Sequence, residues 1–426
     1  MKGMDRRDFV KTGAAASGLL LLKSKTAFGY EANSAIRLGL LGCGNRGTSV
    51  ASSFAKYTSA RVVALGDIFP DKLAAGKTHF DQLNGSLGQA AIENRLLFRG
   101  HEAFQEIAHS KDVDVVQIST PPWFHVQHLE AAVDAGKHVY CEKPVGVDVA
   151  QARKALEIAK RVKGRQSVDV GFEVRSAPPI AAVIERVKGG ALGKIASATG
   201  IYYAPASEEK PFPGASEAEQ RLRNWLWYRA LSGDILVEQD IHIIDLCNWA
   251  LGAHPLKAIA TGGRNIVTHA GDCWDNYQVD YTYPDDVHLS FASTQFGDYG
   301  GFEAGLRIFG SAGAAEAPYA GPVRILGKSA WTWQNASGAG AAISGKFAAN
   351  GDFQDNLTLA DREKERSFIE SITSRRFHNQ IADGVESAQS CMLGRMAGYT
   401  GREVTWEDLL AHGETYALGM DVSQFG

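Results

Sequence analysis

The sequence is poor in the features that mark membrane, metal and disulfide-rich proteins. No stretch of 18 consecutive apolar residues occurs among its 426 residues, which excludes a conventional membrane-spanning helix. It also lacks a metal-ligand spacing, a Walker A loop and a G-x-S-x-G elbow. The cysteines are few, odd in number and widely spaced, so we expect free and mostly buried thiols at Cys43, Cys141, Cys247, Cys273 and Cys391.

The chain also carries little net charge. A formal charge of -4 gives no electrostatic reason to expect a nucleic acid or an anionic membrane as a partner. With 45% hydrophobic and 22% charged residues, the composition is that of an ordinary globular protein. The length suffices for two domains with sizeable cores. We therefore expect a small molecule as the ligand.

The N-terminal residues combine an arginine pair with a short apolar stretch. Arg6 and Arg7 lie in the segment RRDFVK, and residues 13–22 form a mild apolar run that is too short to span a bilayer. This order is typical of a twin-arginine export signal. We predict that residues 1–35 are read by the twin-arginine translocase and that the folded protein reaches the periplasm without stable membrane insertion. The alternative is an accidental arginine pair on a frayed cytoplasmic N-terminus.

A glycine-rich loop follows the first strand pattern. The continuous apolar run from Ile36 to Leu41 predicts a parallel strand buried on both faces, and residues 48–56 read as a helix. Between them, GCGNRG supplies a G-x-G-x-x-G motif, whose glycines permit a tight turn, close approach of a pyrophosphate and close helix packing. We expect a dinucleotide to bind at Gly42, Gly44, Asn45, Arg46 and Gly47.

An acidic residue ends the second predicted strand. The segment RVVALGD ends at Asp67, twenty residues after Gly47. A carboxylate at this position can accept hydrogen bonds from both ribose hydroxyls of NAD, and it repels the 2′-phosphate of NADP. Asp67 therefore favours NAD over NADP as the cofactor. The alternative is an aspartate that caps the helix after Pro70.

Polar residues and prolines stand at the ends of two later predicted strands, DVDVVQIST and KHVYCEKP. The alternation of strands and helices predicts a doubly wound parallel sheet over residues 36–165. In such sheets ligands bind beyond the carboxyl ends of the strands. We expect the cofactor to contact the residues at and just after these ends, namely Ser119, Thr120, Pro121, Pro122, His125, Glu142 and Lys143.

The second half of the chain reads as strands, a loop and closing helices. Alternation of apolar and polar residues over 279–283 indicates half-exposed antiparallel strands. Residues 335–351 have the glycine-rich composition of a surface loop. The segments 360–373 and 383–401 read as helices.

Three segments, GCGNRG, STPPWFHVQHLEAAVDAGKHVYCEKPVGVD and EQDIHIIDLCNWALG, resemble those of the Gfo/Idh/MocA oxidoreductases. The resemblance implies a Rossmann domain followed, over residues 166–426, by an α/β domain with a large, mostly antiparallel open sheet. It implies hydride transfer between NAD(P) and a hydroxyl or carbonyl of a sugar or related polyol. It also implies a homo-oligomer, dimer or tetramer, formed through the open sheet face. With its export signal, the chain is similar to the glucose–fructose oxidoreductase branch.

The resemblance assigns the chemistry to a lysine and a histidine. Lys143 is expected to hold the nicotinamide ribose and to bond the substrate hydroxyl. His242 is expected to take the hydroxyl proton, with the carboxylate of Glu238, where the family usually has aspartate, steadying the charge. We predict one continuous helix that carries Glu238, His242 and Asp245 on one face, with Asp245 orienting the ring. The alternatives are a surface lysine in a turn and a helix-packing histidine bonded to Asp245.

Substrate contacts are expected from three segments, two of them outside the histidine helix. Aromatic faces stack on the C–H surfaces of sugars, and arginines bond hydroxyls or carboxylates. The segment RNWLWYRALSGD is rich in both residue types, and an arginine follows the strand at the domain junction. We predict substrate contacts from Arg175, Trp225, Trp227, Tyr228, Asp240 and His242. For the aromatic side chains, the alternative is a structural anchor for a loop.

A protein that is exported folded, with NAD already bound, meets no pool of fresh cofactor outside the cytoplasm. Each turnover must then return the nucleotide to its starting state. Oxidation of a donor sugar coupled to reduction of an acceptor sugar does so, and we favour this reaction. An NAD-dependent glycoside hydrolase, which oxidises, eliminates and re-reduces, is the alternative. A non-catalytic, cofactor-bound sugar sensor is the alternative from another class.

Overall fold

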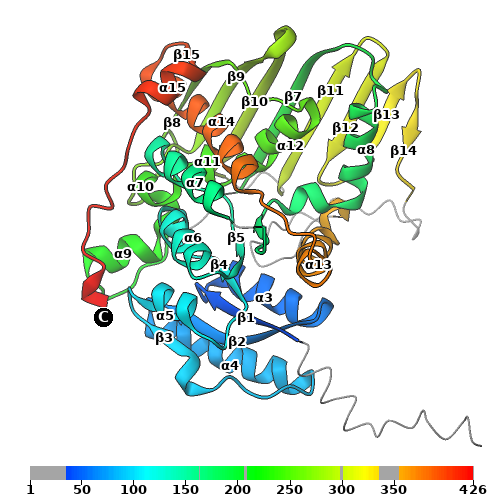
Figure 1. Ribbon diagram of the computed structural model, residues 1–426. Coiled ribbons are helices and arrows are strands. Elements are labelled where there is room, and N and C mark those ends of the chain that lie inside the picture. The colour runs from blue at the N-terminus through cyan, green and yellow to red at the C-terminus, as the bar shows by residue number, and fades with distance from the viewer. Residues whose placement is uncertain (1–34, 163, 206–208, 298–300, 335–354, 426) are drawn as a thin grey trace, which may run out of the picture.

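Two β-sheets organise the protein in the computed structural model (Figure 1), which describes residues 35–162, 164–205, 209–297, 301–334 and 355–425. Residues 1–34 of the predicted export signal and the whole predicted loop 335–351 lie outside the described residues. All five cysteines are buried and free, which confirms the expectation from their spacing. In the described part of the chain, no helix is long and apolar enough to cross a membrane.

The N-terminal sheet is parallel and has six strands in the order β3-β2-β1-β4-β5-β6, which confirms the predicted Rossmann domain. Its first strand, IRLGLL, is buried along almost its whole length, as expected for a strand covered on both faces. The strands are β1 (Ile36–Leu41), β2 (Ala60–Asp67), β3 (Leu97–Arg99), β4 (Val115–Ile118), β5 (His138–Cys141) and β6 (Val168–Val170). The helices between them are α3 (Asn45–Tyr57), α4 (Pro70–Ser86), η2 (Asn94–Leu96), α5 (Ala103–His109), η3 (Pro122–Phe124), α6 (His125–Asp134) and α7 (Val149–Arg161).

The boundary of this domain differs from the predicted one. Strand β6 lies beyond residue 165 and pairs with β5 in parallel, from Val139 opposite Val168 to Cys141 opposite Val170. The N-terminal sheet therefore continues to residue 170. The segment VDV is only three residues long, too short to show a strand pattern in the sequence.

The second sheet has nine strands in the order β14-β13-β12-β11-β7-β10-β9-β8-β15. Only β7 and β10 pair in parallel among its described strand pairs, so the predicted, mostly antiparallel sheet is confirmed. Burial alternates along β9 and β10, so one face is packed and the other meets solvent. The strands are β7 (Ile195–Ala204), β8 (Lys257–Gly263), β9 (Asn276–Tyr283), β10 (Val287–Gln295), β11 (Glu303–Gly310), β12 (Gly313–Pro318), β13 (Arg324–Gly327), β14 (Trp331–Thr332) and β15 (Val404–Thr405).

Helices α8, α12 and α14 pack against this sheet (Figure 1). Helix α14 also packs against α7 and β6, and α13 packs against α3, so the two closing helices join the domains. The helical segments of this part are η4 (Glu173–Ser176), α8 (Pro178–Lys188), α9 (Glu217–Arg223), η5 (Trp225–Trp227), α10 (Arg229–Ser232), α11 (Ile235–Glu238), α12 (Ile241–Leu251), η6 (Pro284–Asp286), η7 (Asp355–Leu357), α13 (Ala360–Thr373), α14 (Ile381–Thr400), α15 (Trp406–His412) and η8 (Ser423–Phe425).

The C-terminal segment returns to the first domain. In Figure 1 it is the red coil that runs from α15 past α10 to a position beside α9, near α5 and β3. Residues 418–425 place their apolar side chains against Phe69 and Phe124, which follow β2 and β4. The carboxyl edge of the parallel sheet is therefore bordered by segments from both ends of the chain.

Candidate active site

The glycine loop after β1 has the shape of a phosphate cradle. Gly42 has a φ of +95°, and a Cβ there would lie 2.5 Å from the carbonyl oxygen of Ser119. A Cβ at Gly47 would lie 2.1 Å from the carbonyl oxygen of Gly42. A Cβ at Gly44 would meet nothing within 4 Å in the described structure, so the backbone there faces open space. The N-cap residue of the helix that starts at Asn45 is Gly44, which has no side chain to cap the helix, and a helix N-terminus of this kind favours an anion.

Asp67 closes the cradle at the end of β2. One carboxylate oxygen accepts from the backbone amide of Cys43 at 2.7 Å, and the other accepts from that of Phe69 at 2.9 Å. The side chain is 8% exposed, and burial raises the pKa of Asp67. Each oxygen keeps a second acceptor position for a ribose hydroxyl. The loop and the carboxylate together fit the adenosine and pyrophosphate of a dinucleotide.

A buried histidine ties together the loops that follow β4 and β5. The Nε2 atom of His125 lies 2.7 Å from the carbonyl oxygen of Thr120, and Nδ1 lies 2.8 Å from that of Pro144. The peptide bond between Lys143 and Pro144 is cis. His125 was predicted to bind the cofactor, but both ring nitrogens are engaged by the backbone. The ring therefore connects the loops after β4 and β5, whereas its predicted contact with the cofactor stays a prediction.

Lys143 forms a buried ion pair with Glu238 across the domain junction. Its Nζ lies 2.8 Å from Oε1 of Glu238, and it also donates to the carbonyl oxygen of Glu238. The two side chains are 12% and 13% exposed. The predicted partnership between these two residues is present, and it fixes the ammonium beside Glu142 at the carboxyl end of β5.

The helix predicted to carry Glu238, His242 and Asp245 is broken. Helix α11 ends at Glu238 and α12 begins at Ile241. The carbonyl oxygen of Glu238 accepts from Lys143, whereas the amide of His242 donates to the carbonyl of Gln239. The carbonyl oxygen of Glu238 accepts from Lys143 instead of from an amide further along the helix. The helix is therefore interrupted after Glu238, and α12 begins at Ile241. Asp240, predicted to contact the substrate, is buried at this break.

His242 is buried at the junction, 8% exposed. Its Nε2 lies 3.7 Å from Oε1 of Glu173, and its Nδ1 has no hydrogen-bond partner among the described residues. Burial and the nearby Lys143 ammonium lower the pKa of His242 to about 3. Asp245 does not orient the ring, because it pairs with Arg175 and accepts from Ser387 at 2.7 Å. This corrects both the predicted orienting role and the alternative of a histidine bonded to Asp245.

A group of buried carboxylates around Arg46 borders His242. The guanidinium of Arg46 binds Asp361 with two hydrogen bonds of 2.7 and 2.8 Å and Glu142 at 3.0 Å, and it lies 3.9 Å from Glu173. Burial raises the pKa of both Glu142 and Glu173 to about 7. Arg46 and Glu142 were predicted to contact the cofactor, but their charged groups bind each other. No group of acids, histidines and cysteines in the described part of the chain is arranged to hold a metal ion.

Sequence reasoning missed Glu173 and Asp361. Glu173 follows β6, a parallel strand whose carboxyl end lies at the same edge as that of β5. The rule that singled out Glu142 would have found Glu173 had β6 been recognised as a strand. Asp361 lies on α13, far along the chain, and gives no local signal.

Arg175 was predicted to contact the substrate, but its guanidinium forms ion pairs with carboxylates of two helices. Its guanidinium forms two hydrogen bonds with Asp245, of 2.8 and 2.6 Å, and lies 3.6 Å from Asp383 on α14. A planar guanidinium and a carboxylate match in this two-point geometry. These ion pairs connect η4, which carries Arg175, with α12 and α14.

The predicted aromatic substrate contacts lie in and just after η5, which packs against α10 and α11. Trp227 is 2% exposed and packs under Gly271, where a Cβ would approach its side chain to 2.8 Å. Trp225 and Tyr228 belong to the cluster that joins the C-terminal segment to Phe69 and Phe124. These side chains therefore anchor the loop beside the cradle, and the prediction that they contact the substrate is wrong for the fully buried Trp227.

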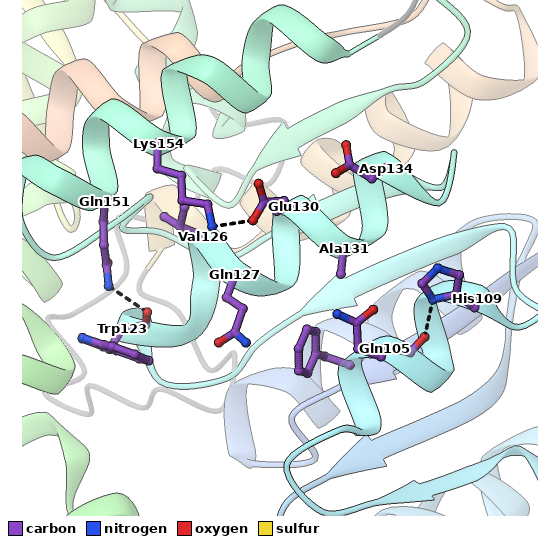
Figure 2. Close-up of a pocket in the computed structure, with 11 residues that line it drawn as sticks. Gln105, His109, Trp123, Val126, Gln127, Glu130, Ala131, Asp134, Gln151 and Lys154 are labelled. Atoms are coloured by element: carbon purple, nitrogen blue, oxygen red, sulfur yellow. Dashed lines mark hydrogen bonds and ion pairs between the residues drawn. The ribbon is translucent and has the colours of Figure 1, made fainter. Parts of the chain in front are cut away.

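A hollow on the outer helical layer is separate from these groups. Figure 2 shows it between α5, α6 and α7, with a volume of about 590 Å³. An ion pair between Lys154 and Glu130 and a 3.0 Å hydrogen bond from Gln151 to the carbonyl of Trp123 form part of its wall. None of the residues predicted to be catalytic lines it.

Comparison with known protein families gives two matches in chain order. Residues 36–171 match the family described as "Oxidoreductase family, NAD-binding Rossmann fold", GFO_IDH_MocA. Residues 180–316 match the "GFO/IDH/MocA C-terminal domain". Together the two matches span more than half of the chain.

The chain is also similar to individual proteins of known sequence or structure. The inositol 2-dehydrogenase of Rhizobium meliloti (strain 1021) is 27% identical over 292 residues, 68% of this chain and 78% of the relative. A glycosyl hydrolase family 109 protein of Solibacter usitatus (strain Ellin6076) is 30% identical over 151 residues, 34% of each chain. The structure of an aldose-aldose oxidoreductase from Caulobacter crescentus matches with a TM-score of 0.67 and 20% identity, covering 87% of this chain and 99% of that one. This structural likeness bears on the fold.

Proposed function

Because this chain belongs to the Gfo/Idh/MocA family of NAD-binding oxidoreductases, we propose that it transfers hydride between NAD and a hydroxyl or carbonyl group of a sugar or related polyol. The observation that carries the proposal is the convergence of Lys143, Glu238 and neutral His242 beside the dinucleotide cradle. The inositol 2-dehydrogenase relative supports a polyol as the substrate class. Asp67 supports NAD rather than NADP.

NAD, when bound, supplies a nicotinamide that accepts or returns hydride. The residues of this chain then bind and deprotonate the substrate hydroxyl. Lys143 is fixed by Glu238 and directs its remaining N–H donor capacity at the hydroxyl oxygen, where negative charge develops as the proton leaves. His242 is neutral at physiological pH, because the pKa of His242 is lowered to about 3, and a neutral imidazole can accept that proton.

The test uses Lys143→Met, which keeps the length of the side chain and removes its charge. The purified variant is incubated with NAD, a panel of cyclitols and aldoses that includes myo-inositol, and an aldose as acceptor. The oxidised and reduced products are measured, because a retained cofactor releases no net NADH. We expect kcat/KM to fall by about 10²–10⁴ with NAD binding retained. The double variant Lys143→Met, Glu238→Gln controls for the stability cost of leaving the Glu238 carboxylate buried and unpaired. Wild-type rates in Lys143→Met would contradict the proposed role of Lys143, whereas a wild-type protein that binds NAD and turns over none of these compounds would favour a sugar sensor.

We further propose that the cofactor is held tightly. The apolar C-terminal segment packs beside the adenosine end of the cradle, with the rings of Phe425 and Phe69 5.7 Å apart. Phe69 is the residue whose amide donates to Asp67. Trp123 donates to the carbonyl of Tyr416 at 3.4 Å, and the amide of Tyr416 donates to Asp148 at 2.7 Å, so the segment is pinned at its start as well. Dissociation of the nucleotide would require this segment to move.

A tightly held cofactor is consistent with the export signal in residues 1–35. Outside the cytoplasm, a closed cycle that oxidises one sugar and reduces another would restore the nucleotide after each turnover. The solvent-facing side of the nine-stranded sheet would serve as the interface of a dimer or tetramer. Cell fractionation tests the compartment, and protein found only in the cytoplasm would contradict the export. Size-exclusion chromatography with light scattering on the purified protein tests the assembly, and a monomer would contradict the interface.

A second candidate function is NAD-dependent glycoside hydrolysis by oxidation, elimination and re-reduction. The similarity over 151 residues to a glycosyl hydrolase family 109 protein favours it. Such an enzyme would release the phenol from an aryl glycoside without net NADH and would exchange deuterium from D₂O at the carbon next to the oxidised centre. A keto or lactone product without that exchange would exclude it.

A further inference from the structure

The cations that act on His242 are already bound to carboxylates. Besides burial, the positive charges of Lys143 and Arg46 lower the pKa of His242, so both cations act at this place in the domain junction. The Nζ atom of Lys143 lies 2.8 Å from Oε1 of Glu238. The guanidinium of Arg46 binds both oxygens of Asp361, at 2.7 and 2.8 Å. Each cation therefore has an anionic partner within the protein.

In the described part of the chain, the Lys143 ammonium keeps one of its three N–H groups for a substrate. The other two donate to the carboxylate and to the backbone carbonyl of Glu238. In the proposed reaction the third N–H group meets the hydroxyl oxygen, on which negative charge develops as the proton leaves. A permanent anion elsewhere on the substrate would compete for this donor. The lysine therefore serves the reacting oxygen and no second charged group.

Arg175, which was predicted to contact the substrate, offers no positive charge either. Its Nε and Nη2 atoms donate to the two oxygens of Asp245, at 2.8 and 2.6 Å, and its Nη1 atom lies 3.6 Å from Asp383. The side chain of Asp245 is 1% exposed. A substrate carboxylate that drew the guanidinium away would leave this buried aspartate unpaired, which is strongly unfavourable.

Carboxyl groups outnumber the two cations of the junction. Those that pair with Lys143 and Arg46 or act on them are Glu142, Glu173, Glu238, Asp240 and Asp361. If only Glu238 and Asp361 are ionised, the charges of these groups already cancel. Burial raises the pKa of Glu142 and of Glu173 to about 7, so at neutral pH these two acids add a share of negative charge. In none of these states is positive charge in excess.

Glu173 faces His242 without a hydrogen-bonded cation in the described structure. Its Oε1 atom lies 3.7 Å from Nε2 of His242, and its Oε2 atom lies 3.9 Å from the Arg46 guanidinium, both beyond hydrogen-bond distance. Glu142 and Asp361, in contrast, accept from that guanidinium at 3.0 Å or less. The side chain of Glu173 is 6% exposed, so solvent ions screen its charge only weakly. A negative group bound beside His242 would meet this carboxylate.

A buried anion needs a cation or several hydrogen-bond donors directed at it. The glycine cradle provides such donors at the helix N-terminus after Gly44, where the pyrophosphate of the dinucleotide fits. The groups around His242 are acids and paired cations instead. The phosphate site and the reacting site therefore have opposite preferences for charge.

We propose that the substrate of this site is an uncharged sugar or cyclitol, and that Glu173 makes the site reject the corresponding uronates. This inference rests on the proposed function and names the substrate class within it. With an effective dielectric constant of about 20, two unit charges about 8 Å apart repel enough to weaken binding about 30-fold. Glu173 is thus a determinant of specificity, whereas Lys143 and His242 act on the hydroxyl that all these compounds share.

The experiment compares sugars with uronates that carry a carboxylate in place of the hydroxymethyl group. Full-length protein loaded with NAD is mixed with D-glucose or D-glucuronate, with D-galactose or D-galacturonate, and with myo-inositol. Reduction of the bound NAD in a single turnover is followed by the absorbance of enzyme-bound NADH, so no acceptor is needed. We expect the neutral compounds that react to do so with a second-order rate constant at least about 30-fold above that of the uronates.

Glu173→Gln keeps the size of the side chain and removes its charge. The preference for the neutral compounds should narrow about tenfold in this variant, mainly through tighter binding of the uronate. Glu130→Gln is the control, because Glu130 pairs with Lys154 on the outer helical layer and its loss should leave the preference unchanged. An equal preference in wild type and Glu173→Gln would overturn the assignment to Glu173.

The comparison in the wild-type protein does not depend on whether a variant folds. A uronate that reacts as fast as its neutral counterpart, or faster, would overturn this inference and leave the proposed function intact. Protein that binds NAD and is reduced by none of the compounds would contradict the proposed function, and the inference with it.

Discussion

At the scale of single residues, we propose that Asp67 selects NAD over NADP. Its carboxylate is held by two backbone amides at the end of β2, so its position does not depend on a bound ligand. A fixed negative charge in a buried place repels a 2′-phosphate more strongly than a mobile surface carboxylate would.

We predict that Asp67→Asn narrows the preference for NAD over NADP by about 10- to 100-fold. The amide keeps an oxygen that can accept from the backbone and removes the charge. Dissociation constants for both nucleotides, measured by calorimetry, check this. Asp134→Asn is the control, because Asp134 is an exposed carboxylate that pairs with Arg161 and its loss should leave the ratio unchanged. An unchanged ratio in Asp67→Asn would show that another group selects the cofactor.

Single residues also show what the sequence could and could not predict. The glycines, Asp67, Lys143 and Glu238 were predictable because each lies at a strand end or in a motif whose geometry is local. Glu173, Asp361 and the partner of Asp245 were not, because their contacts join segments distant in the chain, with Arg46 and Asp361 separated by 315 residues. Aromatic residues next to arginines suggested sugar binding, but the same residue types also build hydrophobic anchors, as Trp227 does.

At the scale of elements, the C-terminal segment forms an extended strap. Leu418, Met420 and Val422 pack into the cluster around Phe69, while the residues between them are exposed. This alternation is the pattern of an extended chain lying with one side on a surface.

We predict that a chain ending after Tyr416 releases NAD about 10- to 100-fold faster than the intact chain, because the apolar cover of the adenosine end is lost. Stopped-flow displacement of bound nucleotide measures the rate. Gln424→Ala, an exposed position of the same segment, should release NAD at the wild-type rate. Equal rates for the truncated and intact chains would mean that the strap does not retain the cofactor.

A buried aspartate with two cationic partners lies where β6 meets the closing helices. Asp169 lies between Lys364 at 3.1 Å and His378 at 3.2 Å. Its hydrogen bond with His378 raises the pKa of that histidine. A raised pKa in the folded state stabilises the protein below the unfolded value of about 6.5, and this stabilisation is lost as pH rises through the folded value.

The stability difference between wild type and His378→Gln should therefore be largest near pH 5.5 and smallest near pH 9. Urea denaturation midpoints at the two pH values measure it. Because His378 is partly exposed, the effect should be less than about 1 kcal/mol. His288→Gln is the control, since that histidine lies on an exposed strand face. A stability difference between wild type and His378→Gln that increases with pH would contradict a stabilising ion pair between His378 and Asp169.

Element boundaries show a similar limit of the sequence. The parallel sheet and the mostly antiparallel sheet were predictable from apolar runs, alternation and the family resemblance, except for the three-residue strand β6. The break between α11 and α12 was not, because it depends on the Lys143 ammonium taking the carbonyl oxygen of Glu238. The sequence contains no proline or glycine at that point, and the cause lies 95 residues away.

At the scale of the whole molecule, the two domains enclose one chemical centre. The cradle comes from the first sheet, His242 and Glu238 come from the second domain, and Arg46, Asp361 and the C-terminal strap link them. This arrangement supports a protein that folds around its cofactor and keeps it. A retained cofactor would explain how an NAD-dependent enzyme works after the proposed export.

The most direct test of this account is the nucleotide content of the purified protein. Protein prepared from the periplasm without added nucleotide is denatured, and the released small molecules are identified by mass spectrometry. The account predicts about one NAD or NADH per chain. Protein that releases no nucleotide, and binds added NAD only weakly, would contradict the claim of a retained cofactor.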